Sequence, residues 1–471
     1  MNEITEKSIR ELIEGIKNKS FSVREVVLAF YNVLKKQETE LKSFIHYLEQ
    51  DLIEKNLQEL EKKATRGDKI LFGIPFSLKD SYCTAGIATT AGSKVLEGYK
   101  PQYNATVYQK LLDNGALLFG KNSQDAWGHG STSENTDFKI ARNPWNLEKV
   151  VGGSSGGCAA AIASRMVAFA IGEDTGGSIR NPASYCNITG LKVTYGRVSR
   201  YGTIAYGSSL DTVGPMAKSV EDIAQILSVI AGYDPFDATS SPEDVPDYTG
   251  NLKKGIKNIT LGVPKEFFQS GTDKEVVKTV RDAILVFENL GAKVIEVSIP
   301  SIDIGVAAYY LLAPSETSSN LARYDGIRYG QARDKFTLET MRRILIGTYA
   351  LSAGYYDAYY KKSLKARTII KKDYQNAFEK CDLLIAPVNP TPAPKIGEMA
   401  SDPIALMLSD IYTLTQNIAG IPALALPCGF TSGGLPIGMQ LMGDMFKEEN
   451  ILQAGFAYQE LTDWHKRKPN L

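Results

Sequence analysis

Two loops rich in glycine and serine hold the residue types with the clearest chemical potential. The first, VVGGSSGGCAAA over residues 150–161, carries Ser154 between pairs of glycines. The second, IGEDTGGSIRNPAS over residues 171–184, carries Ser178 directly after two glycines. Successive backbone N–H groups in such a loop can converge on an anion, as an oxyanion hole requires. The pattern favours a serine nucleophile at Ser178, although a purely structural turn stays open as an alternative.

A serine nucleophile needs a base, and histidine is scarce in this chain. The three histidines are His46, His129 and His465. Lys79 ends the apolar, strand-like segment FGIPFSLKD. A lysine titrates near ~10.4, so serving as a base at neutral pH requires a downward pKa shift of roughly three units. Burial at the end of an apolar strand can supply that shift, and Ser154 could relay the proton.

Other sites that these motifs could form have weaker support. The first loop lacks the GxxxxGK[ST] spacing of a phosphate cradle, and close packing of a loop on a helix explains its glycines equally well. Neither HExxH nor CxxC occurs, so we predict no metal site and no disulfide framework.

Composition limits the possible functions. The 471 residues carry 53 Lys plus Arg and 53 Asp plus Glu, so the net charge is zero, which argues against a protein that mainly coats nucleic acid or anionic membrane. Five widely spaced cysteines favour a reducing compartment. The N-terminus resembles no signal peptide and no long apolar run occurs, so we expect a cytoplasmic protein without membrane contact.

Hydrophobic periodicity predicts the elements that must position these loops. Residues 5–68 are expected to be helical, with a capping box at Ser22 and Glu25. Alternating short strands and helices after Ile70 predict an α/β fold, and residues 233–258 are the best linker candidate. Strand, helix and strand are expected over residues 259–299, a long helix over 335–380, and short strands in the tail. Length alone suggests about three domains.

The motifs together resemble the amidase signature family. GGSSGG, followed after about twenty residues by DTGGSIR and preceded by the lysine of GIPFSLKD, matches that family's signature, and the likeness extends over nearly the whole chain. The resemblance implies one domain over residues 1–471, in place of three. Its fold would be α/β, with a large mixed, twisted central sheet surrounded by helices. Residues 1–68 would form a helical segment packed on it, and residues 72–215 the catalytic signature region.

The same resemblance implies roles for individual residues. Lys79 would be the base, Ser154 the bridging serine after a cis peptide bond, and Ser178 the nucleophile. The oxyanion hole would be formed by the backbone N–H groups of Thr175, Gly176, Gly177 and Ser178. The sequence departs from the usual family pattern at Val151, Cys158, Glu173 and Val193.

Segments such as GLKVTYGRVSRYGTIAYGSSLDTVGPMAKSVED resemble one branch of the family, the A subunits of glutamyl-tRNA(Gln) and aspartyl-tRNA(Asn) amidotransferases. That branch implies hydrolysis of glutamine through a glutamyl-enzyme on Ser178, which supplies ammonia. The B and C subunits of the amidotransferase would be partners. The complex would use ATP and Mg²⁺ and would bind misacylated tRNA mainly through its B subunit, while this chain itself would hold no cofactor.

The branch also implies residues that bind glutamine: Arg343 for the carboxylate, Asp410 for the ammonium, and Tyr309 as a hydrogen-bonding group. Arg342 is the alternative to Arg343, and the role of His129 is open. Two other functions are weighed. One is a stand-alone amidase for small or fatty amides, and the other is a non-catalytic scaffold, against which the retained Lys79 and serines argue.

Overall fold

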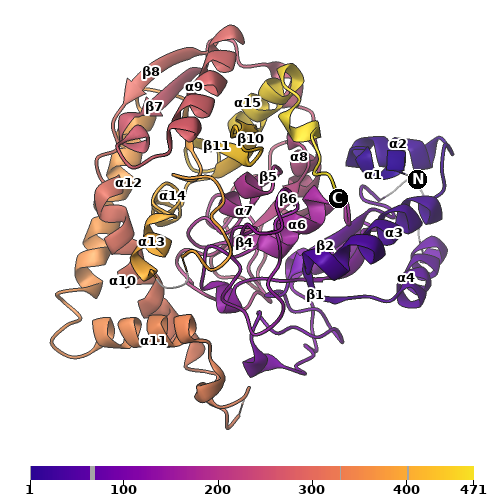
Figure 1. The fold of residues 1–471 in the computed structure, drawn as a ribbon, viewed down its shortest axis with the longest axis horizontal. Helices are drawn as coiled ribbons and strands as arrows, with labels where there is room; N and C mark the ends of the chain where they lie inside the picture. Colours follow the sequence, from indigo (N-terminus) through magenta and orange to yellow (C-terminus); the bar gives the residue numbers. More distant parts are fainter. Residues whose placement is uncertain (1, 64–68, 329, 400–401) are drawn as a thin grey trace.

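A single mixed β-sheet forms the centre of the structure (Figure 1). The computed structural model describes residues 2–63, 69–328, 330–399 and 402–471. Within those ranges the strand order is β1-β3-β2-β4-β6-β5-β10-β11-β9-β7-β8. The bounds, in chain order, are β1 Phe44–Tyr47, β2 Pro75–Lys79, β3 Leu117–Asn122, β4 Phe169–Asp174, β5 Thr189–Lys192, β6 Thr212–Ala217, β7 Thr260–Pro264, β8 Lys293–Val297, β9 Leu383–Pro387, β10 Ala423–Phe430 and β11 Pro436–Gly443.

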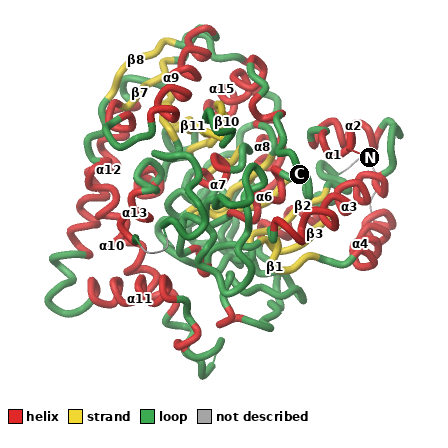
Figure 2. The backbone as a smooth tube through the Cα atoms, in the orientation of Figure 1, coloured by secondary structure: helices red, strands yellow, loops and turns green. Residues whose placement is uncertain are grey.

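Helices surround this sheet, as Figure 2 shows, and the predicted α/β class is confirmed. Helices α1–α4 lie at one end of the molecule and α10–α12 at the other (Figure 1). The bounds are α1 Asn2–Glu6, α2 Ile9–Lys17, α3 Val23–Leu41, α4 Gln50–Lys63, α5 Thr106–Asp113, α6 Gly156–Ala163, α7 Arg180–Tyr185, α8 Val220–Ile230, α9 Lys274–Asn289, α10 Ile302–Leu321, α11 Leu338–Leu351, α12 Tyr360–Phe378, α13 Pro403–Leu408, α14 Leu414–Ala419 and α15 Glu448–Leu461. No helix in the described ranges is long and apolar enough to cross a membrane.

The sheet combines parallel and antiparallel pairs, and this pairing brings the two motif loops together. Strand β2 pairs in parallel with both β3 and β4, whereas β4 pairs antiparallel with β6. The carboxyl ends of β2 and β4 therefore meet at one edge of the sheet. Lys79 ends β2 and Asp174 ends β4, so the predicted base and the second motif loop become neighbours.

The N-terminal segment is mostly helical, as predicted, and packs on the sheet. The capping box is present: the Glu25 N–H donates to Ser22 Oγ at 3.1 Å, and the Ser22 N–H donates to Glu25 Oε2 at 2.6 Å. The purely helical expectation was wrong for β1, which pairs antiparallel with β3. Residues 64–68 of the predicted segment lie outside the described residues.

Two further predictions had different outcomes. The strand, helix and strand expected over residues 259–299 are confirmed as β7, α9 and β8, with the strands parallel. The single long helix over residues 335–380 was wrong, because α11 ends at Leu351 and α12 begins at Tyr360. Gly354, between them, has a φ of +86°, a left-handed conformation that a continuing helix does not contain.

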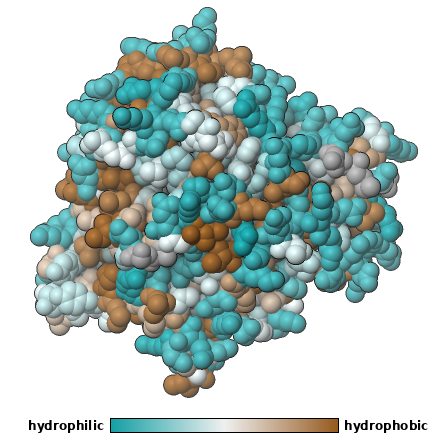
Figure 3. Space-filling view, in the orientation of Figure 1, coloured by the Kyte–Doolittle hydropathy of each residue, from teal (hydrophilic) through white to brown (hydrophobic). Residues whose placement is uncertain are grey.

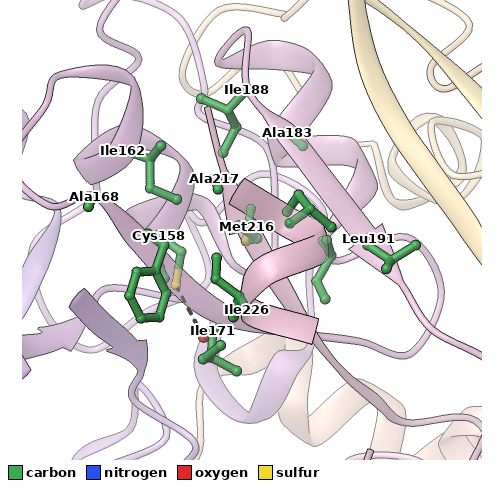
Figure 4. Packing of buried hydrophobic residues seen from close by; sticks show 14 of the residues in the cluster. Cys158, Ile162, Ala168, Ile171, Ala183, Ile188, Leu191, Met216, Ala217 and Ile226 are labelled. Carbon is green, nitrogen blue, oxygen red and sulfur yellow. Dashed lines mark hydrogen bonds between the residues drawn. The ribbon is translucent and has the colours of Figure 1, made fainter. Parts of the chain in front are cut away.

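The first motif loop runs into a helix that is buried along its whole length. All eight residues of α6 are buried, because small side chains let this helix lie close to the sheet. A Cβ on Gly157 would lie 2.4 Å from the Ser43 carbonyl oxygen, so the glycine is required by packing. In Figure 4 the side chain of Cys158 points into this core, where its thiol donates to the Ile171 carbonyl at 3.8 Å. Cys158 is therefore a core residue.

Candidate active site

Lys79 lies fully buried at the end of β2, where its Nζ has three acceptors. Nζ donates to Ser154 Oγ at 2.7 Å, to Glu173 Oε2 at 2.7 Å and to the Glu173 carbonyl oxygen at 3.3 Å. The predicted base and the predicted bridging serine are thus in direct contact. The carboxylate of Glu173 is an additional partner of the lysine.

The loop that carries Ser154 is also tied to Ser178. The peptide bond between Gly153 and Ser154 is cis, as the family resemblance implies. The N–H of the next residue, Ser155, donates to the Ser178 carbonyl oxygen at 3.1 Å. Lys79 and Ser154 are 0% exposed, whereas Ser178 is 7% exposed. The predicted nucleophile is therefore the most accessible of the three residues.

Asp174 holds the loop that precedes Ser178. Its carboxylate accepts the N–H of Gly177 at 2.8 Å, the N–H of Ile179 at 3.1 Å, and two guanidinium contacts from Arg180 at 3.1 Å each. Burial alone would raise the pKa of this carboxyl, but the charge and hydrogen bonds of Arg180 outweigh burial and lower the pKa to about 2. The carboxylate thus stays ionised and fixes the turn.

This anchoring changes the set of N–H groups open to an oxyanion. The Gly177 N–H already donates to Asp174. The N–H groups of Thr175, Gly176 and Ser178 have no acceptor among the residues that the structure describes. Three of the four predicted donors are therefore available, and their role as an oxyanion hole stays a prediction.

Gly176 brings a predicted substrate-binding residue to the same loop. A Cβ on Gly176 would lie 2.6 Å from the ring and hydroxyl oxygen of Tyr309, so only glycine allows this approach. The hydroxyl of Thr413 donates to the Gly176 carbonyl at 2.7 Å. Thr413 also donates its N–H to the carbonyl of Asp410, which ties that residue to the loop.

The predicted pair Arg343 and Asp410 lies buried beside two tyrosines. Arg343 Nη1 donates to the hydroxyl of Tyr206, and its guanidinium lies over the ring of Tyr310, 5.4 Å from the ring centre. The hydroxyl of Tyr310 donates to Asp410 at 3.4 Å, so this tyrosine links the two charged residues. Burial raises the pKa of Asp410 to about 7.

The structure separates the two candidate arginines. The side chain of Arg343 is 4% exposed and that of Arg342 is 42% exposed, although both pair with Glu339. Arg343 is therefore the arginine that lies buried against Tyr206 and Tyr310, near Asp410.

His129 is a fully buried histidine whose two ring nitrogens both have partners. Nδ1 lies 3.2 Å from the hydroxyl of Thr340, and Nε2 lies 3.3 Å from that of Thr317. Burial, followed by the charges of Arg343 and Lys79, lowers its pKa well below the usual value. His129 is thus neutral and partnered, and its ring packs 4.6 Å from that of Tyr206.

Several residues of the site had no assigned role in the sequence motifs. Tyr206, Tyr310 and Ser131 contact the predicted binding residues, and the hydroxyl of Ser131 donates to Asp410. Nothing in their local sequence marks them. Glu173 was visible only as a departure from the usual family pattern. In the described ranges no group of three or more His, Cys, Asp or Glu side chains is arranged to hold a metal ion.

Comparison with known proteins identifies the family of this chain. A family model described as Amidase matches residues 25–452. The chain is 48% identical to the A subunit of the glutamyl-tRNA(Gln) amidotransferase from Thermoanaerobacter pseudethanolicus, across 99% of this chain and 98% of that one. The crystal structure of the corresponding A subunit from Thermotoga maritima superposes with a TM-score of 0.83 at 36% identity, covering 96% of this chain and 93% of that one.

A second solved structure shows how widely this fold is used. The structure of 6-aminohexanoate cyclic dimer hydrolase superposes with a TM-score of 0.89 at 25% identity and covers 99% of each chain. The predicted fold is thereby confirmed. The chain belongs to the amidase family, within the group of its glutamyl-tRNA(Gln) amidotransferase A subunits.

Proposed function

We propose that this chain is the glutaminase component of a tRNA-dependent amidotransferase. Ser178 would attack the side-chain amide of glutamine while its proton passes through Ser154 to Lys79. The free N–H groups of Thr175, Gly176 and Ser178 would stabilise the oxyanion. Release of ammonia would leave a glutamyl-enzyme, which water then hydrolyses.

The observation that carries the proposal is the buried arginine and aspartate beside this triad. Free glutamine has a carboxylate and an ammonium on one carbon, and each needs a charged partner once it leaves water. Arg343 can pair with the carboxylate through two parallel N–H groups, and Asp410 can pair with the ammonium. A simple aryl or fatty amide has neither charge and would leave both residues unused.

The partners follow from the names of the relatives and from the surface. We propose that B and C subunits complete a heterotrimer, that the complex uses ATP and Mg²⁺, and that misacylated tRNA binds mainly to the B subunit. Apolar side chains are exposed along α11 at Leu338, Leu345 and Tyr349. Hydrophobic atoms gather over α10–α12 in Figure 3, which supports a protein partner in that region.

Two further features complete the proposal. We assign residues 1–471 to one domain, because strands between residues 44 and 443 belong to one sheet. A cytoplasmic location agrees with five free, buried cysteines, since a reducing compartment keeps thiols unpaired.

The first experiment measures glutamine hydrolysis by the full chain with and without the B and C subunits. The complete complex should convert Glu-tRNA(Gln) to Gln-tRNA(Gln) with ATP and Mg²⁺, and Ser178→Ala should abolish both glutaminase activity and the glutamyl-enzyme. A chain that binds no partner and hydrolyses aryl or fatty amides far better than glutamine would be a stand-alone amidase.

A matched pair of arginine variants tests the pocket. Arg343→Met should raise KM for glutamine by about 10- to 100-fold, because a charge-assisted hydrogen bond to the carboxylate is lost. Arg342→Met removes an exposed arginine that pairs with the same Glu339, and should leave KM within about twofold. Steady-state kinetics on glutamine distinguish the two variants. Equal changes in KM would show that Arg343 does not bind the carboxylate of glutamine.

A further inference from the structure

Glu173 makes the surroundings of Lys79 different from those of a lone buried lysine. Three acceptors around Nζ match the three N–H groups of a protonated ammonium. A lysine that accepts the proton of Ser154 must instead present a lone pair. One proton therefore has to leave Nζ before Ser178 can attack. Of the three acceptors only the carboxylate of Glu173, 2.7 Å away, is a base that can hold it.

The hydroxyl of Thr175, beside the other carboxylate oxygen of Glu173, indicates a second bound proton. Thr175 Oγ1 lies within hydrogen-bond distance of Glu173 Oε1 and lies 2.7 Å from Asp211 Oδ1. A hydroxyl has one proton to donate, and here it faces an oxygen of each carboxyl group. One of these two carboxyls must therefore be protonated and donate to the threonine.

Asp211 is the carboxyl that holds this proton in the resting site. Burial, followed by the nearby charge of Glu173, raises the pKa of Asp211 to about 8. The order of donation then runs from Asp211 to Thr175 and from Thr175 to Glu173, while Lys79 donates to the other oxygen of Glu173. Glu173 thus accepts a hydrogen bond on each oxygen and stays ionised at rest.

The register of strands β4 and β6 brings Glu173 and Asp211 close together, and a pocket connects them with solvent. Glu173 on β4 lies opposite Val213 on the antiparallel β6, so Asp211 comes directly before the paired segment. Both carboxyl residues line a surface pocket of about 490 Å³, together with Arg200 and Phe236. Phe236 is 72% exposed, so the pocket opens to water, which can exchange protons with the carboxyl pair.

We propose that Glu173 is a positioning residue and proton acceptor for Lys79, assisted by Thr175 and Asp211. Before attack, a proton moves from Lys79 Nζ to Glu173 Oε2, which leaves a neutral amine and a neutral carboxylic acid. On attack, the Ser178 proton passes to Ser154 and the Ser154 proton to Lys79, while the amide oxygen gains the negative charge. Lys79 then returns a proton through Ser154 to the departing ammonia. The inference rests on the proposed triad.

This arrangement predicts an unusual pH dependence. The resting pair is an ammonium and a carboxylate, and the reactive pair is a neutral amine and a carboxylic acid. Both hold the same number of protons, so turnover does not require loss of a proton to solution. Other titratable groups near the pair enter the same profile: Tyr82, Asp125, His129, Cys158, Arg200 and Asp211.

The test compares Glu173→Gln with the wild-type full chain. Glutamine keeps the size, and its carbonyl oxygen can still accept the hydrogen bond from Lys79, while its NH2 group donates to Thr175, which then donates to Asp211. Its amide cannot accept a proton, so Lys79 must release its proton to water. The rate of the p-nitrophenolate burst from p-nitrophenyl acetate, measured from about pH 5 to about pH 10, reports acylation of Ser178. The acid limb should move upward by at least about one pH unit in Glu173→Gln. Glu173→Asp, which keeps a carboxylate, should retain the wild-type limb.

Each outcome decides the proposal. A purely structural Glu173 would lower the burst rate at every pH without moving the limb, and that result would overturn the inference. If Glu173→Gln does not fold, Glu173→Ser carries the same test. A limb that shifts in a chain inactive on glutamine would reject the proposed substrate and keep the role of Glu173. A wild-type chain whose Ser178 is not acylated at all would reject the triad and this inference together.

Discussion

Strand β4 ends in two adjacent carboxyl residues, Glu173 and Asp174, and both lie buried beside a cation. Successive residues of a strand point to opposite faces, so the two ion pairs lie on either side of the sheet. Asp174 pairs with Arg180, and Glu173 pairs with Lys79. Both pairs lie beside the loop around Ser178, yet they differ in how firmly the cation holds its proton.

The pair on the Asp174 side is static. Arg180 cannot lose its proton, and its guanidinium also donates to Gln416, Gln440, Asn417 and the Thr413 carbonyl. The pKa of Asp174, lowered to about 2, keeps that carboxylate charged at neutral pH. Lys79, by contrast, can lose a proton, and Glu173 has a hydrogen-bonded route to Asp211. The comparison indicates that one pair fixes geometry and the other transfers protons.

Replacing each cation by methionine should separate these two roles. The largest expected effect is the loss of catalytic rate in Lys79→Met. Lys79→Met should lower kcat by at least about 10³-fold, because the triad members act as one unit. Its effect on stability should shrink as pH falls, since Glu173, left without its cation, can then take up a proton at little cost. Kinetics on glutamine and chemical denaturation measure both quantities. A Lys79→Met variant with near-normal kcat would contradict the role of Lys79.

Arg180→Met should show the opposite balance, with its main effect on stability. Removing the guanidinium leaves Asp174 ionised, buried and without its cation, which costs about 3–5 kcal/mol of unfolding free energy. Arg24→Met is a matched control, because Arg24 forms an exposed pair with Glu54, and such pairs contribute less than about 1 kcal/mol. Urea denaturation measures the difference. Equal losses of unfolding free energy in the two variants would show that the pair of Asp174 and Arg180 does not stabilise the fold.

The sequence was sufficient to propose the candidate reacting residues, because they lie in contiguous motifs, and the structure places Lys79 in contact with Ser154. The glycines around Ser154 and the DTGGS turn before Ser178 mark loops in which a backbone must adopt unusual conformations. Lys79 was found from its place at the end of an apolar segment. The fold itself came from alternating strands and helices and from the resemblance to the amidase signature family.

The sequence could not predict contacts that depend on strand pairing. Glu173 meets Lys79 only because β2 and β4 are parallel neighbours, and it approaches Asp211 only because β4 and β6 are antiparallel. No local pattern records either pairing. Tyr206 and Tyr310 were missed for the same reason, since they reach the site from segments far apart in the chain. The strand β1 was missed because its four residues lie in a stretch rich in Glu and Lys.

A further expected effect is on how stability varies with pH. Asp211 has a folded-state pKa of about 8, above its unfolded value near ~3.9. Between these values the folded chain holds a proton that the unfolded chain has lost, so this group makes stability fall as pH rises from about 4 to about 8. Asp174 acts in the opposite direction, because its folded pKa of about 2 removes stability only as pH falls below about 4.

Asp211→Asn isolates the first of these contributions. The amide can donate to Thr175 but cannot titrate, so the variant should lose less stability than the wild type between about pH 5 and about pH 8. Its stability at low pH should be lower, because the Gly207 N–H, which donates to Asp211 Oδ1 at 2.9 Å, loses its acceptor when the amide nitrogen faces Thr175. Urea denaturation at a series of pH values gives both curves. Parallel curves would mean that Asp211 is already ionised at neutral pH, and the proton between the two carboxyls would then belong to Glu173.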